Sequence, residues 1–92
     1  MSSKLKLRIK REMSAEKPTI WIGKKGVAPQ TMDEISRQLD QNEIVKVKLL
    51  KTALKDEEAK NVAAKIAQET ASSLVDVRGH TFVLYKPRKR KP

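Results

Sequence analysis

Residues 23–26 read Gly23-Lys24-Lys25-Gly26, so two glycines enclose two lysines. The segment follows a short apolar run and precedes Pro29, a residue that favours the first turn of a helix. Glycine lets a backbone approach a ligand closely, and a helix N-terminus presents free N–H groups that suit a phosphate. A GxxG pattern alone also fits a tight, hydrated turn. The place between a strand and a helix favours a loop that holds a sugar–phosphate backbone, as the GXXG loop of a KH domain does.

The other residues that could support catalysis or metal binding do not form a site. The loop matches neither the GxxxxGK[ST] pattern of nucleotide hydrolases nor the GxGxxG pattern of dinucleotide-binding proteins. His80 is the single histidine of a chain without cysteine, which disfavours a zinc site, and we expect it in a turn. The run Asp56-Glu57-Glu58 is explained by a helix start, with Asp56 as N-cap and both glutamates in the first turn. We therefore expect no enzyme, no cofactor, no metal and no small-molecule substrate.

Positive charge is concentrated at the two ends of the sequence. The chain of 92 residues has a formal net charge of +10 and a pI near 10.1. Residues 1–25 contain eight Lys/Arg and two acids, residues 86–92 contain five Lys/Arg and no acid, and residues 26–85 contain eight basic and nine acidic residues. This distribution indicates a polyanionic partner more than charge added for solubility.

The length suits one domain with a small core, since a chain of this size buries only about 60–65% of the surface that it exposes when unfolded. The absence of cysteine favours the cytoplasm over secretion. No apolar run approaches the roughly 18 residues of a membrane span, and the N-terminus lacks the apolar segment of a secretory signal. We expect a cytoplasmic protein with no membrane partner.

Hydrophobic periodicity predicts the element order α-β-α-β-α-β-β. Helices are expected over residues 3–14, from Pro29 to about residue 40, and over 56–70, and strands over 19–22, 43–51, 74–78 and 81–85. Strand–helix–strand units favour parallel pairing, whereas the short Gly79-His80 connection predicts an antiparallel hairpin. The predicted fold is a single compact α/β (α+β) domain, in which helices pack on one mixed four-stranded sheet.

Only three residues are aromatic, namely Trp21, Phe82 and Tyr85. Phe82 and Tyr85 have opposite parity in one predicted strand, so we expect them on opposite faces of the sheet. A small core usually takes up its one tryptophan, and we therefore expect Trp21 in the core rather than stacked on a base. Few aromatic residues and high charge predict recognition of nucleic-acid backbone and shape more than reading of bases.

Three segments are specific enough to suggest a family. They are the I-G-x-x-G-V turn at 22–27, the N-E-I-V-K-V-K strand at 42–48 and the V-R-G-x-T-x-V-L-Y-K-P ending at 77–87. With them, nearly the whole chain resembles the CRM domain, named for chloroplast RNA splicing and ribosome maturation, whose free-standing bacterial members are YhbY-like proteins. The resemblance implies a fold similar to the C-terminal domain of translation initiation factor three. One departure is Ala28-Pro29, where relatives often place a Ser or Thr helix cap.

The resemblance also implies RNA binding, since free-standing prokaryotic members are linked to precursors of the large ribosomal subunit. We expect residues 1–86 to form the RNA-binding domain and residues 87–92 to form a flexible basic tail. The residues expected to contact RNA belong to the loop, to a basic stripe on the first helix and to the C-terminal end: Gly23, Lys24, Lys25 and Gly26; Lys4, Arg8 and Arg11; Lys86, Arg88, Lys89, Arg90 and Lys91.

Two other functions fit the same size and charge. One is a DNA-coating chromatin protein, such as the small basic α/β proteins of archaea. The other is a ribosome-associated module that is held mainly by protein contacts. The sequence favours ribosomal RNA as the partner, during assembly of the large ribosomal subunit.

Overall fold

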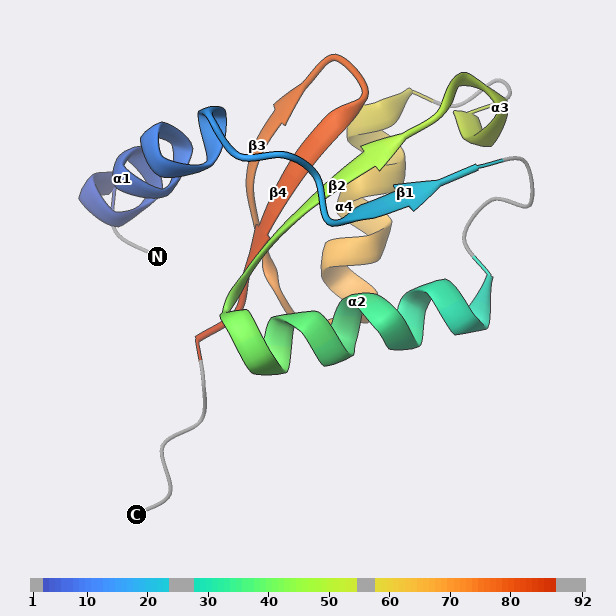
Figure 1. The fold of residues 1–92 in the computed structure, drawn as a ribbon, viewed down its shortest axis with the longest axis horizontal. Coiled ribbons are helices and arrows are strands. Elements are labelled where there is room, and N and C mark those ends of the chain that lie inside the picture. The colour runs from blue at the N-terminus through green and yellow to red at the C-terminus, as the bar shows by residue number, and fades with distance from the viewer. Residues whose placement is uncertain (1–2, 24–27, 55–57, 88–92) are drawn as a thin grey trace.

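A four-stranded mixed sheet forms the centre of the fold, with its strands in the order β1-β2-β4-β3 (Figure 1). The structure is a computed structural model that describes residues 3–23, 28–54 and 58–87. β1 (Ile20–Ile22) pairs in parallel with β2 (Ile44–Leu49), while β4 (Thr81–Tyr85) pairs antiparallel with both β2 and β3 (Ser73–Arg78). The sheet predicted from the sequence is thus confirmed.

Helices cover the two faces of this sheet unequally (Figure 1). α2 (Pro29–Asn42) and α4 (Ala59–Glu69) lie on one face, and α1 (Ser3–Ser14) lies on the other, where it contacts β3. α3 (Lys51–Leu54) is a single short turn that follows β2. Among the described residues, α1 is the one helix on its side of the sheet, and it lies towards the β3 edge, so the described elements leave the β1 end of that face open.

The strands alternate side chains into two separate cores, because successive residues of a strand point to opposite faces. The main core lies between the sheet and helices α2 and α4, and Phe82 and Leu84 are buried in it. The second, smaller core lies under α1, where Ile9, Val75 and Val83 are buried together. Tyr85 packs against the second core, so Phe82 and Tyr85 lie on opposite faces, as predicted.

The apolar stripes of the first two helices account for their orientation. In α1, Ile9 is buried while Leu5 and Met13 pack beside it, which confirms a helical spacing of four residues. In α2, Ile35 and Leu39 are fully buried and Met32 packs against them. Each helix therefore turns one narrow apolar face to the sheet and leaves its charged face to solvent.

The position of β4 and the region after β2 differ from the prediction. β4 enters between β2 and β3, so the β2–α4–β3 crossover joins two strands that are not neighbours. α4 begins at Ala59, and Glu58 stands at its N-cap without a side-chain capping bond rather than in its first turn. Asp56 and Glu57 lie outside the described residues. β2 ends at Leu49, because α3 occupies the positions that follow.

Turn geometry agrees with the sequence at two places. The β3–β4 hairpin turns at Gly79, whose φ of 56° lies in the left-handed region, and exposed His80 completes the turn. The His80 carbonyl accepts a hydrogen bond from Leu49 N–H at 2.6 Å, which ties the hairpin to β2. α2 begins with Pro29 in its first turn, after Ala28, which provides no side-chain cap.

The described residues contain no helix that is long and apolar enough to cross a membrane.

Candidate nucleic-acid interface

The predicted phosphate-binding loop connects the end of β1 to the start of α2. Lys24, Lys25 and Gly26 lie outside the described residues, whereas Gly23 is described and half-buried. Gly23 does not have a positive φ. A Cβ atom added at Gly23 would meet Leu50 Cδ1 at 3.4 Å, an ordinary van der Waals distance. The fold therefore does not require glycine at position 23.

The predicted basic stripe of α1 lies on the solvent side of that helix. Lys4, Arg8 and Arg11 are all exposed, and they border a shallow surface hollow together with Leu7, which is 52% exposed. Arg8 Nε donates to Glu12 Oε1 at 3.1 Å, one turn further along the helix. Because the Arg8 and Glu12 side chains are 76% and 54% exposed, this ion pair contributes little and can be exchanged for an anionic ligand.

The C-terminal end of the domain is anchored beside α2. Lys86 N–H donates to the Glu43 carbonyl at 2.8 Å, and Lys86 Nζ lies 4.0 Å from Asp40 Oδ1. Lys86 is therefore held by the fold rather than extended into solvent. The other predicted tail contacts, Arg88, Lys89, Arg90 and Lys91, lie outside the described residues.

Trp21 is not a core residue, contrary to the prediction. Its neighbours Ile20 and Ile22 point into the main core, so strand alternation directs Trp21 to the opposite face, where it is 57% exposed. The expectation failed because it rested on the average burial of tryptophan, whereas the alternation of this short strand decides the side. The alternation in Ile20-Trp21-Ile22 could have indicated that Trp21 faces away from the main core.

Trp21 begins a row of side chains that crosses all four strands. It pairs with Lys48 in β2, Lys48 pairs with Thr81 in β4, and Thr81 pairs with Arg78 in β3. Each member lies next to a strand residue of the main core, so all four point to the α1 side of the sheet. The second core lies under the next rows, those of Val83 and Tyr85. We call Trp21, Lys48, Thr81 and Arg78 the open row.

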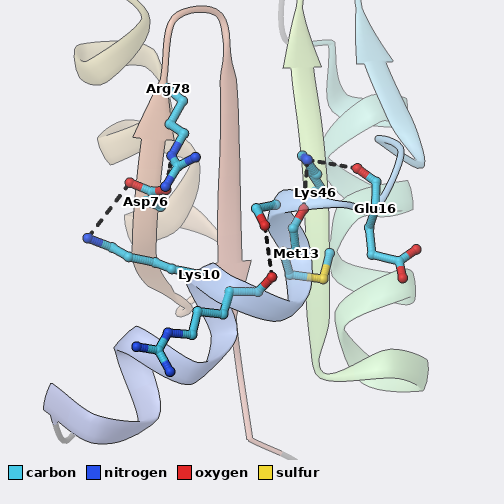
Figure 2. A network of polar contacts seen from close by, with 8 residues as sticks. Lys10, Met13, Glu16, Lys46, Asp76 and Arg78 are labelled. Atoms are coloured by element: carbon cyan, nitrogen blue, oxygen red, sulfur yellow. Dashed lines mark hydrogen bonds and ion pairs between the residues drawn. The ribbon is translucent and has the colours of Figure 1, made fainter.

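The boundary between α1 and the open row is held by charged contacts (Figure 2). Lys46 Nζ donates to the Met13 and Glu16 carbonyls, each at 2.7 Å, and so satisfies oxygens at the C-terminal end of α1. On the other side, Asp76 joins Lys10 of α1, at 3.9 Å, to Arg78, at 3.1 Å. These contacts fix the position of α1 and the edge of the open surface.

A pocket of about 170 Å³ lies at this boundary. Its wall contains three cations, Lys10, Lys46 and Arg78, and one carboxylate, Asp76, together with the Thr81 hydroxyl. The excess of cations favours an anionic ligand nearby, while the carboxylate favours a donor such as a ribose hydroxyl inside. Among the described residues, no group of three or more His, Cys, Asp or Glu side chains could hold a metal ion.

The sequence matches the model of the CRS1/YhbY (CRM) domain over residues 1–86. The chain belongs to this family. A protein of Methanocaldococcus jannaschii, named a probable RNA-binding protein, is 32% identical over 89 residues, which cover 97% of this chain and 66% of the relative. The Haemophilus influenzae relative, named an RNA-binding protein, is 32% identical over 95% of this chain and 86% of its own length.

A Bacillus subtilis relative and one solved structure agree with this assignment. The Bacillus subtilis protein, also named a probable RNA-binding protein, is 33% identical over 78% of this chain and 73% of its own length. The latter is a hypothetical protein of Staphylococcus aureus, described as a candidate RNA-binding protein. Its solution structure superposes with a TM-score of 0.78 at 27% identity and covers 100% of this chain and 94% of the other. The predicted family and fold are therefore confirmed.

The structure of this CRM domain distributes the predicted contact residues over separate places. The basic stripe lies on α1, Lys86 follows β4, and Gly23 follows β1. Sequence reasoning missed the open row, because its members are recognised as neighbours only when the strand registers are known. The alternation of Lys46 and Lys48 with buried valines was the one available signal, and it did not distinguish a helix-anchoring lysine from a free one.

Proposed function

We propose that this CRM domain binds RNA, and that its partner is ribosomal RNA during assembly of the large ribosomal subunit. The observation that carries the proposal is the match to the CRS1/YhbY family over residues 1–86, joined to relatives that are named as RNA-binding proteins. The net charge of +10 supports it, because phosphate neutralisation supplies most of the affinity for a nucleic-acid backbone.

In the proposal, the Gly23–Gly26 loop holds the RNA backbone, while the α1 stripe and the tail add electrostatic attraction. The loop precedes the N-terminus of α2, which has Pro29 in its first turn and no side-chain cap. Backbone N–H groups at that end are thus free of a capping side chain and suit a phosphate oxygen. Exposed Lys4, Arg8 and Arg11 suit the same backbone from a second element.

The loop is tested with two variants that separate charge from backbone access. Replacing both Lys24 and Lys25 by Ala should weaken binding to structured ribosomal RNA and flatten the log–log salt slope by about one to two units. Gly23→Ala should leave the unfolding temperature nearly unchanged, because among the described residues the new Cβ meets Leu50 alone, at 3.4 Å. Its affinity for RNA should nevertheless fall if a phosphate backbone approaches that position. Unchanged affinity and slope in both variants would remove the loop from the interface.

The class of nucleic acid is tested by competition at physiological salt. Excess duplex DNA should fail to displace structured ribosomal RNA, and displacement at equal concentrations would favour the DNA-coating function instead.

Association with ribosomal particles is tested by sedimentation. Nuclease treatment should release the protein from the particles, and retention would show that protein contacts dominate.

The RNA site itself can be located by crosslinking in cells, with the crosslinked positions read by sequencing. Sites concentrated in precursors of large-subunit RNA are expected. Crosslinks spread evenly over messenger and transfer RNA would contradict a role in subunit assembly while leaving general RNA binding intact.

A further inference from the structure

The exposure of Trp21 calls for an account, because a large aromatic ring open to water contributes little to a small core. It is 57% exposed, more than Leu7 and Leu50, the other exposed large hydrophobic residues among those that the structure describes. Tryptophan offers a broad π face, and stacking on a nucleobase requires an accessible ring. The ring is therefore available for a planar ligand.

The charges around Trp21 indicate what kind of planar ligand fits. Lys48, its partner in register on β2, is exposed and has no carboxylate partner among the described residues. Arg78 closes the same row on β3 and is 71% exposed, although its Nε donates to Asp76. An aromatic ring with one cation beside it and a second cation at the other end of the row matches a chain of bases joined by phosphates and would be poorly matched to a purely apolar partner.

The geometry of the row suits an extended chain. Adjacent strands lie about 4.8 Å apart, so Trp21 and Arg78 are separated by roughly 14 Å across the sheet. This span accommodates a few nucleotides running across the strands, with phosphates near Lys48 and Arg78. Paired RNA keeps its bases stacked in the helix, so a base can reach the indole only from a single-stranded or bulged segment.

We propose that the open row, formed by Trp21, Lys48, Thr81 and Arg78, binds single-stranded RNA with one unpaired base stacked on the indole of Trp21. This inference rests on the proposed RNA-binding function and assigns a second contact to it, separate from the loop and from the α1 stripe. A stacked base adds a contact to the recognition of backbone and shape that the sequence predicts.

Trp21 is the only tryptophan of the chain, so intrinsic fluorescence reports on this one position. Titration with a single-stranded oligouridine of about ten nucleotides should quench the emission, and quenching should saturate with the affinity that anisotropy of a labelled oligonucleotide gives. A fully paired RNA hairpin should bind through charge without comparable quenching.

Two substitutions distinguish stacking from folding. Trp21→Thr removes the ring but keeps a residue that favours strands, and it should lower the affinity for the oligonucleotide about 5- to 150-fold. Trp21→Phe keeps a ring and should retain most of the affinity. Leu7→Gln removes a similarly exposed apolar side chain from α1 and should change the affinity by less than about twofold. Circular dichroism and thermal unfolding of each variant check that the fold is kept.

The outcomes separate this inference from the proposed function. If the oligonucleotide and hairpin both bind but emission is unchanged and Trp21→Thr binds as tightly as the original protein, the stacking site is wrong while RNA binding stands. If neither RNA binds, both proposals are overturned. An equal loss in Trp21→Thr and Leu7→Gln would also contradict a specific stack.

Discussion

Two lysines on one strand of this protein have different tasks, although they are only two residues apart. Lys46 and Lys48 both point to the α1 side of the sheet, but only Lys46 is bonded to carbonyls at and just beyond the end of α1, those of Met13 and Glu16 at 2.7 Å. Hydrogen bonds from a charged donor are stronger than neutral ones, and a cation is favoured at a helix C-terminus. Lys46 is therefore a residue that positions α1, whereas Lys48 remains available for a ligand.

Lys46→Met should accordingly lower the free energy of unfolding by about 1–2 kcal/mol, because it removes both bonds to the end of α1. For a chain of this length, the unfolding temperature should fall by roughly 4–15 °C. Lys48→Met is the matched control and should stay within about 0.5 kcal/mol of the original protein. Chemical denaturation of both variants measures the difference, and equal stabilities would show that Lys46 does not anchor the helix.

The residue scale also shows where sequence reasoning succeeds and where it fails. The separation of Phe82 from Tyr85 followed from strand parity alone and is confirmed. The same parity argument applied to Ile20, Trp21 and Ile22 would have placed Trp21 outside the core, but a prior for tryptophan burial was preferred. The task of Lys46 could not be predicted, since its acceptor carbonyls lie 33 and 30 residues away in the chain.

At the scale of elements, the end of α4 contains a backbone conformation that its residue type does not favour. Ala71 has a φ of 54°, directly after the C-cap residue Thr70. Its N–H donates to the Gln68 carbonyl at 3.2 Å, and Ser72 N–H donates to the Ala67 carbonyl at 2.9 Å. Glycine is the usual residue at such a helix end, because a Cβ atom is strained in the left-handed region.

Ala71→Gly should therefore raise the free energy of unfolding by about 0.5–1 kcal/mol, since relief of strain exceeds the added entropy of the unfolded chain. The same substitution at exposed Ala64, in the middle of α4, should lower it by about 1 kcal/mol. The pair thus predicts opposite signs for one chemical change. Denaturant titration of the two variants tests this, and a loss of stability in both would contradict the strain at Ala71.

Element types were predictable from the sequence, whereas strand order was not. The periodicity of α2 and β2 was clear, because each has one buried face and one exposed face. The insertion of β4 between β2 and β3 depends on tertiary pairing, since Val45 and Leu84 meet only when the hairpin folds back. α3 and the late start of α4 were missed because a single helical turn leaves almost no periodic signal.

At the scale of the whole molecule, the nearly neutral segment of the chain forms most of the core, and the basic segments attract a polyanion. Residues 26–85, with eight basic and nine acidic residues, supply most of the main core, whereas the excess charge lies in residues 1–25 and 86–92. Charge that does not contribute to the core can vary without unfolding the domain. Long-range electrostatic attraction of a polyanion then depends on the ends of the chain, whereas the specific contacts with it depend on the folded surfaces.

Neutralising the tail should therefore change binding kinetics without changing stability. Replacing Arg88, Lys89, Arg90 and Lys91 by Gln should flatten the log–log salt slope for structured RNA by up to roughly three units. The association rate at low salt should fall, and the dissociation rate should change much less, because steering acts before contacts form. Stopped-flow mixing at several salt concentrations measures both rates.

Arg37→Gln, which removes a cation already paired with Glu34 on α2, is the control and should leave the slope unchanged. If the tail variant instead dissociates faster while its salt slope stays the same, the tail makes specific contacts with RNA. Long-range attraction and specific binding would then not be divided between the ends of the chain and the folded domain.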